Sequence, residues 1–146
     1  MKQPGCELCE AEGGRLVLSN EFLRVVLVDD PHFPGFARVI WHDHVREMSD
    51  LAAADQQRLM QAVFAVERAQ RAVLAPDKVN LASLGNVVAH LHWHVIPRFA
   101  DDSHFPQPVW GTRLCERSEE ALESRRGQLD ELRRRIAAEV ARVARP

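Results

Sequence analysis

Apolar and polar positions alternate along residues 90–96, which read HLHWHVI. Alternation with a period of two predicts a β-strand, because neighbouring side chains of a strand point to opposite faces. The three histidines therefore share one face with Ile96, and the apolar residues between them take the other. With a rise of about 3.3 Å per residue, alternate side chains lie about 6.5–7 Å apart. The sequence thus predicts a row of imidazoles on a face that is too polar for a core.

The rest of the chain shows both strand and helix patterns. Short apolar runs bounded by turn residues predict strands at residues 15–18, 23–28, 36–41 and 78–81. Helical spacing of apolar residues predicts a helix from Ser49, its expected N-cap, to the residue before Pro76. A charged second helix with an apolar stripe is predicted over residues 118–144, and residues 1–14 are predicted as loop.

These elements predict an α+β domain, in which an antiparallel β-sheet carries one long helix packed on it and an additional C-terminal helix. We expect residues 1–146 to form a single domain. The strand at residues 78–81 and the histidine strand are expected to form a hairpin through a turn at Gly85. The stripe of the C-terminal helix could dock on its own domain or on a second subunit, and the sequence does not choose between them.

Composition narrows the classes of function. The net charge of −2 gives no reason to expect affinity for nucleic acid or for an anionic membrane. The first residues lack the pattern of a signal peptide, and no apolar run approaches membrane-spanning length. We therefore expect a cytoplasmic protein without a membrane partner. The three cysteines do not make a disulfide framework.

A row of three histidines has three possible uses. The face could be merely solvated, although such a face normally mixes threonine, lysine, glutamate and serine. The histidines could bind a transition metal, because imidazoles on strands supply zinc sites. They could also perform covalent catalysis, in which a neutral imidazole attacks an electrophilic phosphorus. The spacing alone leaves all three interpretations open.

The motif His-φ-His-φ-His-φ-φ, where φ is apolar, resembles the signature of the histidine triad (HIT) family of nucleotide hydrolases and transferases. The following Pro97-Arg98 resembles the dinucleoside polyphosphate hydrolase branch of that family. The resemblance covers about residues 6–110 and leaves the C-terminal helix, about 118–144, outside the shared pattern. It implies a HIT-like fold and a homodimer.

The resemblance also implies a role for each histidine of the triad. His92 is expected to attack the α-phosphorus of a nucleotide and to form a covalent nucleotidyl-histidine. The backbone carbonyl of His90 would hold the proton on the other ring nitrogen of His92, and His94 would donate to a phosphate oxygen or the leaving group. Dinucleoside polyphosphates such as diadenosine tetraphosphate are the expected substrates. The alternatives are a nucleoside phosphoramidate hydrolase and a nucleotide-binding module without significant catalysis.

Further residues are expected to bind the substrate. Asp29 lies where the family places a residue that binds both ribose hydroxyls, although an Asp29-Asp30 pair is also typical of a turn. Asn80 resembles part of the family segment that contacts phosphate and ribose. Arg98, just beyond the triad, could meet a longer phosphate chain.

The segment before the triad departs from the family pattern. Asn86 can donate from its amide, but Val87 stands where the family often has a serine or threonine, and valine cannot donate. Stabilisation of the leaving group by a hydroxyl is therefore in doubt at this position. Ser83 is a candidate substitute.

Cys6 and Cys9 form a Cys-x-x-Cys pair that could bind a metal, react as a redox pair, or be incidental. Some relatives carry an N-terminal zinc, and the resemblance implies the ligands Cys6, Cys9, His44 and His90, with His42 as the rival of His44. Two thiolates and two imidazoles close a tetrahedral zinc site, so this zinc would be structural. The covalent chemistry itself would require no cofactor.

Overall fold

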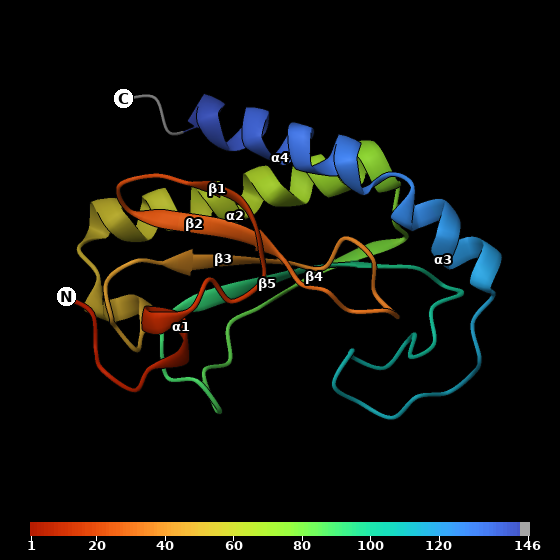
Figure 1. Cartoon of the computed structure of the whole chain (residues 1–146), viewed down its shortest axis with the longest axis horizontal. Helices are drawn as coiled ribbons and strands as arrows, with labels where there is room; N and C mark the ends of the chain where they lie inside the picture. The colour runs from red at the N-terminus through yellow and green to blue at the C-terminus, as the bar shows by residue number, and fades with distance from the viewer. Residues whose placement is uncertain (144–146) are drawn as a thin grey trace.

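A five-stranded antiparallel sheet forms the centre of the computed structural model, which describes residues 1–143 (Figure 1). Its strands are β1 (Arg15–Ser19), β2 (Leu23–Leu27), β3 (Ala37–Trp41), β4 (Lys78–Ala82) and β5 (His92–Arg98). Their order in the sheet is β1-β2-β3-β5-β4, so β5 is paired along both edges. A slip of β5 would break two ladders and turn its buried face outward, which fixes its register. The predicted α+β class and antiparallel sheet are confirmed.

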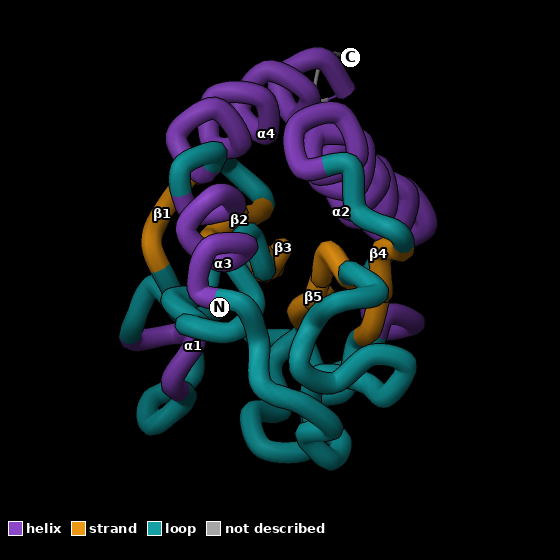
Figure 2. Tube along the Cα trace, turned by 90° about the vertical axis from the view of Figure 1, so that its right-hand side faces the viewer, coloured by secondary structure: helices purple, strands orange, loops and turns teal. Residues whose placement is uncertain are grey.

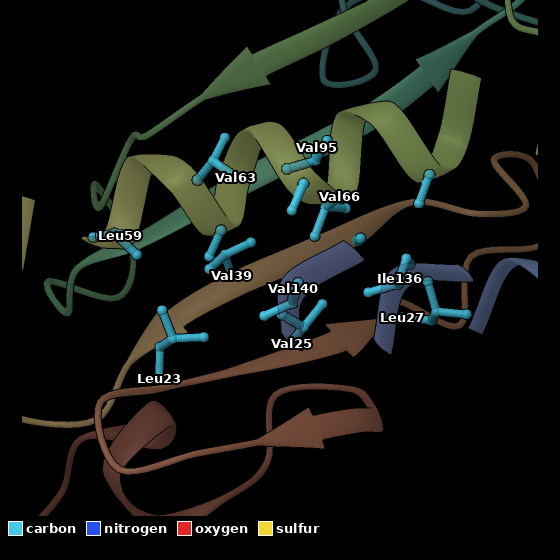
Figure 3. Close-up of a cluster of buried hydrophobic side chains, with 14 of the residues drawn as sticks. Leu23, Val25, Leu27, Val39, Leu59, Val63, Val66, Val95, Ile136 and Val140 are labelled. Carbon is cyan, nitrogen blue, oxygen red and sulfur yellow. The ribbon is translucent and has the colours of Figure 1, made fainter. Parts of the chain in front are cut away.

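Two long helices, α2 (Ala53–Leu74) and α4 (Leu129–Val143), cover the same face of this sheet (Figure 2). All five residues of β2 are buried, and those that point toward the helices join the main core. Figure 3 shows how side chains of the strands meet those of both helices; it labels Leu23, Val25, Leu27, Val39, Leu59, Val63, Val66, Val95, Ile136 and Val140. Residues of β5 that alternate with the histidines therefore anchor the strand in the core.

The C-terminal helix differs from the prediction of one element over residues 118–144. It is divided into α3 (Glu119–Arg126) and α4, with the break at Gly127 and Gln128. Glycine is a poor helix former, and the break lets the two helices run in different directions. The stripe of α4 packs against α2 in the same chain, which answers the question of where it docks. Ala144, the predicted end, lies outside the described residues.

The prediction of a loop over residues 1–14 was wrong in part, because the short helix α1 (Glu7–Glu10) lies within it. A helix of four residues contains too little periodicity for its pattern to be read from the sequence. It lies on the face of the sheet opposite α2 and α4 (Figure 1). The buried guanidinium of Arg24 donates to the carbonyls of Leu8 and Ala11, at 2.7 and 3.0 Å, and so fixes this segment.

The boundaries of α2 also differ from the prediction at one end. Instead of an N-cap at Ser49, the chain forms a 3₁₀ turn, η1 (Met48–Asp50), and α2 begins at Ala53. The C-terminal end agrees, since the helix stops at Leu74 before Pro76.

Within residues 1–143, no helix combines the length and the apolar character that crossing a membrane would require.

The packing of α4 predicts a specific loss of stability. Ile136 has 0% exposure, so Ile136→Ala should lower the free energy of unfolding by about 2–5 kcal/mol through lost burial and a cavity. Urea denaturation would measure this value. Arg135→Ala, on the exposed side of the same helix, is the control and should cost less than about 1 kcal/mol. Equal losses in the two variants would contradict the docking of α4 on the core.

Candidate functional site

The three histidines lie in a row at the start of β5, on the face opposite α2 and α4. His90, His92 and His94 are exposed by only 1%, 8% and 6%. The sequence pattern suggested a face too polar for burial, but other segments cover it. The N-terminal segment with α1 lies over one end, and the loop that carries Trp110 lies over the other. The histidines are therefore enclosed rather than solvated.

His92 is held in one tautomer by the backbone of its own strand. Its Nδ1 donates to the carbonyl oxygen of His90 at 2.6 Å, and because a carbonyl can only accept, Nδ1 must carry the proton. Burial lowers the pKa of His92. The hydrogen bond to His90 raises this pKa by a smaller amount, and the charge of Arg38 lowers it further. The ring is therefore neutral at physiological pH, with the lone pair on Nε2. A neutral imidazole with a free Nε2 is a nucleophile.

His94 lies in an aromatic setting beside His92. Its ring centroid is 4.8 Å from that of His92, 4.9 Å from Trp110 and 5.5 Å from Phe36. Burial, with the neighbouring His92 and Arg38, lowers the pKa of His94 to about 3. Its buried Nδ1 has no hydrogen-bond partner among the described residues. His94 is therefore a neutral ring whose nitrogens make no hydrogen bond within residues 1–143.

A cavity of about 450 Å³ opens beside His92 and His94. Its volume falls in the range of small-molecule sites, and most of its wall is apolar. The remaining lining residues come from α1, β3, the loop before β5 and the loop after it: Glu7, Leu8, Arg38, Leu84, Gly85, Asn86, Val87, Val88 and Trp110. Of the expected substrate residues other than the triad, Asn86 is the one that the structure places here.

The segment before β5 gives Ser83 a role toward the strand. The Ser83 hydroxyl donates to the backbone carbonyl of His92 at 2.9 Å, which supports the position of His92. Val87 is 96% exposed, so its side chain adds little to the wall of the cavity. The donor that the family often has at this position is therefore absent, and the remaining donors must come from elsewhere.

Arg98 and Asn80 lie on the same face but are joined to each other rather than to the cavity. Arg98 donates to Asn80 Oδ1 at 2.9 Å and, through Nε and Nη2, to both carboxylate oxygens of Asp102 at 2.7 and 3.0 Å. A further bond of 2.7 Å reaches the carbonyl of Gln107. With 2% exposure, the guanidinium of Arg98 is fully occupied by the protein. It fixes the loop that carries Trp110 over His94.

Asp29 lies just beyond the end of β2, exposed, and is not part of the wall of the triad cavity. Its neighbour Asp30 accepts from the backbone amide of His32 at 2.8 Å. The turn-forming role that the sequence allowed for either residue therefore falls to Asp30. The carboxylate of Asp29 makes no hydrogen bond within residues 1–143.

The structure brings together Cys6, Cys9, His44 and His90 as a cluster that could hold a metal ion. Their donor atoms all lie within 4.8 Å of one another. His90 Nδ1 is 3.5 Å from Cys6 Sγ and 3.4 Å from Cys9 Sγ, and His44 Nδ1 is 3.6 Å from Cys9 Sγ. Ligands of a tetrahedral zinc ion are separated by about 3.3–3.8 Å, given bonds of about 2.0–2.3 Å. The donor set therefore fits zinc in both chemistry and spacing.

The surroundings of the cluster prepare His90 to act as a ligand. Its Nε2 donates to the carbonyl of Trp41 at 2.7 Å, which leaves the lone pair of Nδ1 facing both sulfurs. Burial lowers the pKa of His90, so the ring is neutral, as ligation requires. His42, the rival of His44, points elsewhere: its Nε2 lies 2.9 Å from the carbonyl of Asn20.

Sequence reasoning missed Arg38 and Glu7, and it did not give Trp110 a place beside the triad. Arg38 has a recognisable signal, since it is the charged residue within the apolar strand β3 and lies opposite His94 in the sheet. Glu7 and Trp110 come from segments without periodicity, so only the folded chain shows that they line the cavity.

Comparison with known proteins gives consistent results. A family model described as "HIT domain" matches residues 12–101. A histidine triad protein from Marinobacter aquaeolei VT8 superposes with a TM-score of 0.74 and 26% identity over 99% of both chains. A histidine triad protein from Bradyrhizobium japonicum superposes with a TM-score of 0.71 and 25% identity, over 88% of this chain and 92% of that chain. A zinc-bound histidine triad family protein from Mycobacterium smegmatis shares the fold, with a TM-score of 0.58 and 22% identity. The match covers 88% of this chain and 95% of that chain.

Among curated proteins, the chain is similar to an AP-4-A phosphorylase of Mycobacterium tuberculosis. The two are 28% identical over 109 residues, which is 70% of this chain and 56% of the relative. The same values hold for the protein of a second strain. The chain thus spans little more than half the length of the curated relatives it matches.

The buried pair of Arg98 and Asp102 predicts a pH-dependent loss of stability. Asp102→Asn should cost about 3–5 kcal/mol at pH 7, because it leaves the guanidinium buried without its counter-ion. Burial alone would raise the pKa of Asp102, but hydrogen bonds from Arg98 and from the amides of His104 and Phe99 outweigh it and the pKa is lowered. Ionised Asp102 therefore stabilises the fold above about pH 4, and this contribution is lost as the pH falls through the folded-state pKa.

Urea denaturation at several pH values would measure this effect. The difference between the parent and the Asp102→Asn variant should shrink in acid. Glu116→Gln is a matched control, since Glu116 pairs with Arg113 at the surface, where both side chains are exposed, and should contribute less than about 1 kcal/mol. A loss for Asp102→Asn that stays constant down to pH 2 would contradict the assignment.

Proposed function

Because this chain belongs to the HIT family, we propose that it is an enzyme that cleaves nucleotides at the α-phosphate through a covalent nucleotidyl-histidine on His92. The observation that carries the proposal is the hydrogen bond of 2.6 Å from His92 Nδ1 to the carbonyl of His90. It leaves Nε2 as the free nitrogen of a neutral ring that lines the cavity. This combination of tautomer, neutrality and access is what nucleophilic attack by an imidazole requires.

The proposed reaction has two steps. In the first, the Nε2 lone pair of His92 forms a bond to the α-phosphorus, while the bond to the leaving oxygen breaks and the leaving phosphate departs with its electron pair. The positive charge that develops on the ring is stabilised through Nδ1–H and the carbonyl of His90. In the second, water attacks the phosphorus, the phosphorus–nitrogen bond returns its electrons to His92, and a water proton passes to solvent. His94 donates to a phosphate oxygen in both steps.

We propose dinucleoside polyphosphates, such as diadenosine tetraphosphate, as the preferred substrates. The similarity to a mycobacterial protein named AP-4-A phosphorylase supports this choice. The neutral state of His94 also supports it, because a polyphosphate leaves as an anion and needs no proton, whereas the amine of a phosphoramidate must be protonated. Inorganic phosphate could replace water in the second step, which would give phosphorolysis rather than hydrolysis.

We propose one structural zinc ion in the cluster of Cys6, Cys9, His44 and His90. All four positions of a tetrahedral ion would be filled by protein, so the ion would supply cross-linking and not chemistry. The ligands join the N-terminal segment to the residue whose carbonyl orients His92. Zinc would thereby fix the start of the catalytic strand.

The homodimer implied by the family resemblance and the cytoplasmic location stay predictions. The position of β4 at the edge of the sheet is compatible with a dimer, because an edge strand has free hydrogen-bonding groups along one side. A nucleotide or dinucleotide is the expected small-molecule partner.

The release of a nucleoside monophosphate tests the function. We expect the parent protein to release adenosine monophosphate from diadenosine tetraphosphate, and His92→Ala to lose activity by about 10⁴-fold or more, as loss of a nucleophile does. His94→Ala should keep part of the activity, since it removes a donor and not the nucleophile. Chromatography with mass spectrometry would identify the products.

Three results would change this proposal. Equal activity of the parent and His92→Ala would exclude covalent catalysis by His92. Faster cleavage of adenosine phosphoramidates than of diadenosine polyphosphates would favour the alternative substrate class. Tight nucleotide binding without any release would favour the binding module.

Metal content tests the zinc site separately. Elemental analysis of the purified protein should give about one zinc per chain, and Cys9→Ser should lower this content strongly because it removes a thiolate. His92→Ala should retain the zinc, since His92 is not in the cluster. Loss of the metal from His92→Ala would instead indicate that the triad itself is the metal site.

A further inference from the structure

Arg38 lies on β3 directly opposite His94 on β5, where the two are paired in the sheet. Both side chains line the same cavity as His92. A permanent cation is thus built into the wall of the cavity beside the nucleophile.

Two polar atoms of neighbouring strands are left without partners at this place. Arg38 donates through Nη1 to the carbonyl of Gly13 at 2.8 Å, but its buried Nε has no hydrogen-bond partner among residues 1–143. The same is true of the buried His94 Nδ1. Buried polar groups in folded proteins are nearly always satisfied, and these two belong to residues that are paired across the sheet and line the same cavity, so a ligand in the cavity would be their nearest new partner.

The charge of the cavity indicates which kind of ligand this is. Among the described residues that line the cavity, Arg38 is the only lysine or arginine. Burial lowers the pKa of Arg38, which reflects the cost of keeping its charge away from water. Glu7 also lines the cavity, and its charge raises the pKa of Arg38 against the larger effect of burial, but the two side chains form no salt bridge within the described part of the chain. The guanidinium is therefore not paired directly with a carboxylate and can contact an anion in the cavity.

We propose that Arg38 binds a non-bridging oxygen of the phosphate that His92 attacks, a role that rests on the proposed function of this site. Its planar guanidinium can hold such an oxygen while His94 donates to a second one. This contact also supplies a donor in a site that has valine at position 87, where a hydroxyl would otherwise be expected. Arg38 would thus act at the α-phosphate itself and not on the distal part of the substrate.

A structural role is the competing explanation, because Arg38 also holds the carbonyl of Gly13. The two roles predict different effects of substituting Arg38 on ligand binding and on the stability of the fold. A structural role would change the binding of any nucleoside together with the stability of the fold. A phosphate-binding role would change only the binding of ligands that carry the phosphate.

Isothermal titration calorimetry of Arg38→Gln with adenosine and with adenosine monophosphate separates these roles. We expect the affinity for adenosine monophosphate to fall about tenfold or more, and the affinity for adenosine to change less than about twofold. Arg38→Lys should recover part of the lost affinity by restoring the charge. Arg15→Gln on the edge strand β1 is a matched control, since it removes an exposed arginine from the same sheet. Equal weakening of both ligands, or of neither, would overturn the proposal.

Kinetics then test the same contact in the reaction. Arg38→Gln should lower kcat/KM by a similar factor for diadenosine tetraphosphate and for an adenosine phosphoramidate, because both carry the α-phosphate. A loss confined to the polyphosphate would overturn the assignment to the α-phosphate. The calorimetric result does not depend on turnover. An inactive parent that still binds adenosine monophosphate through Arg38 would contradict the proposed function and leave this contact standing.

Discussion

The hydrogen bond between the carbonyl of His90 and Nδ1 of His92 is the interaction on which the site depends. His90 uses its backbone for this bond, its Nε2 for the carbonyl of Trp41 and its Nδ1 for the two cysteine sulfurs. One residue therefore joins the sheet, the cysteine and histidine cluster and His92. Both ring nitrogens and the backbone carbonyl of His90 have partners within the protein, so its side chain can be almost completely buried without an unsatisfied polar atom.

Two buried arginines hold the segments that enclose the cavity. Arg24 bonds to the carbonyls of the N-terminal segment, and Arg98 pairs with Asp102 in the loop that leads to Trp110. Both segments are mostly irregular, although Leu8 of the N-terminal segment packs against Val26 and Ile40. Charge-assisted hydrogen bonds to buried groups add to this packing, because such bonds are stronger than neutral ones. The walls of the site are thus anchored electrostatically, while the sheet beneath is held by its core.

Much of the fold follows from patterns that the sequence carries openly. The strands and α2 have the periodicities that predict them, and alternation along β5 correctly separates the histidine face from the core face. The break of the C-terminal helix at Gly127 was missed because the apolar stripe continues across it. The partners of Arg98 and the position of Arg38 in the cavity depend on contacts between distant segments, which no local pattern encodes.

The strand β5, which carries His92 and His94, is constrained from several directions at once. From the helix side, Gln70 of α2 donates to the carbonyls of Val95 and Gly35, at 2.8 and 2.9 Å, in the fully buried interior. Along its edges β5 is paired with β3 and β4, and at its start the cluster around His90 ties it to the N-terminal segment. Because a reacting group must stay within a fraction of an ångström of its productive position, a central, doubly paired strand suits the nucleophilic role proposed for His92. The face of β5 that packs in the core therefore supports that role as directly as the face that carries the histidines.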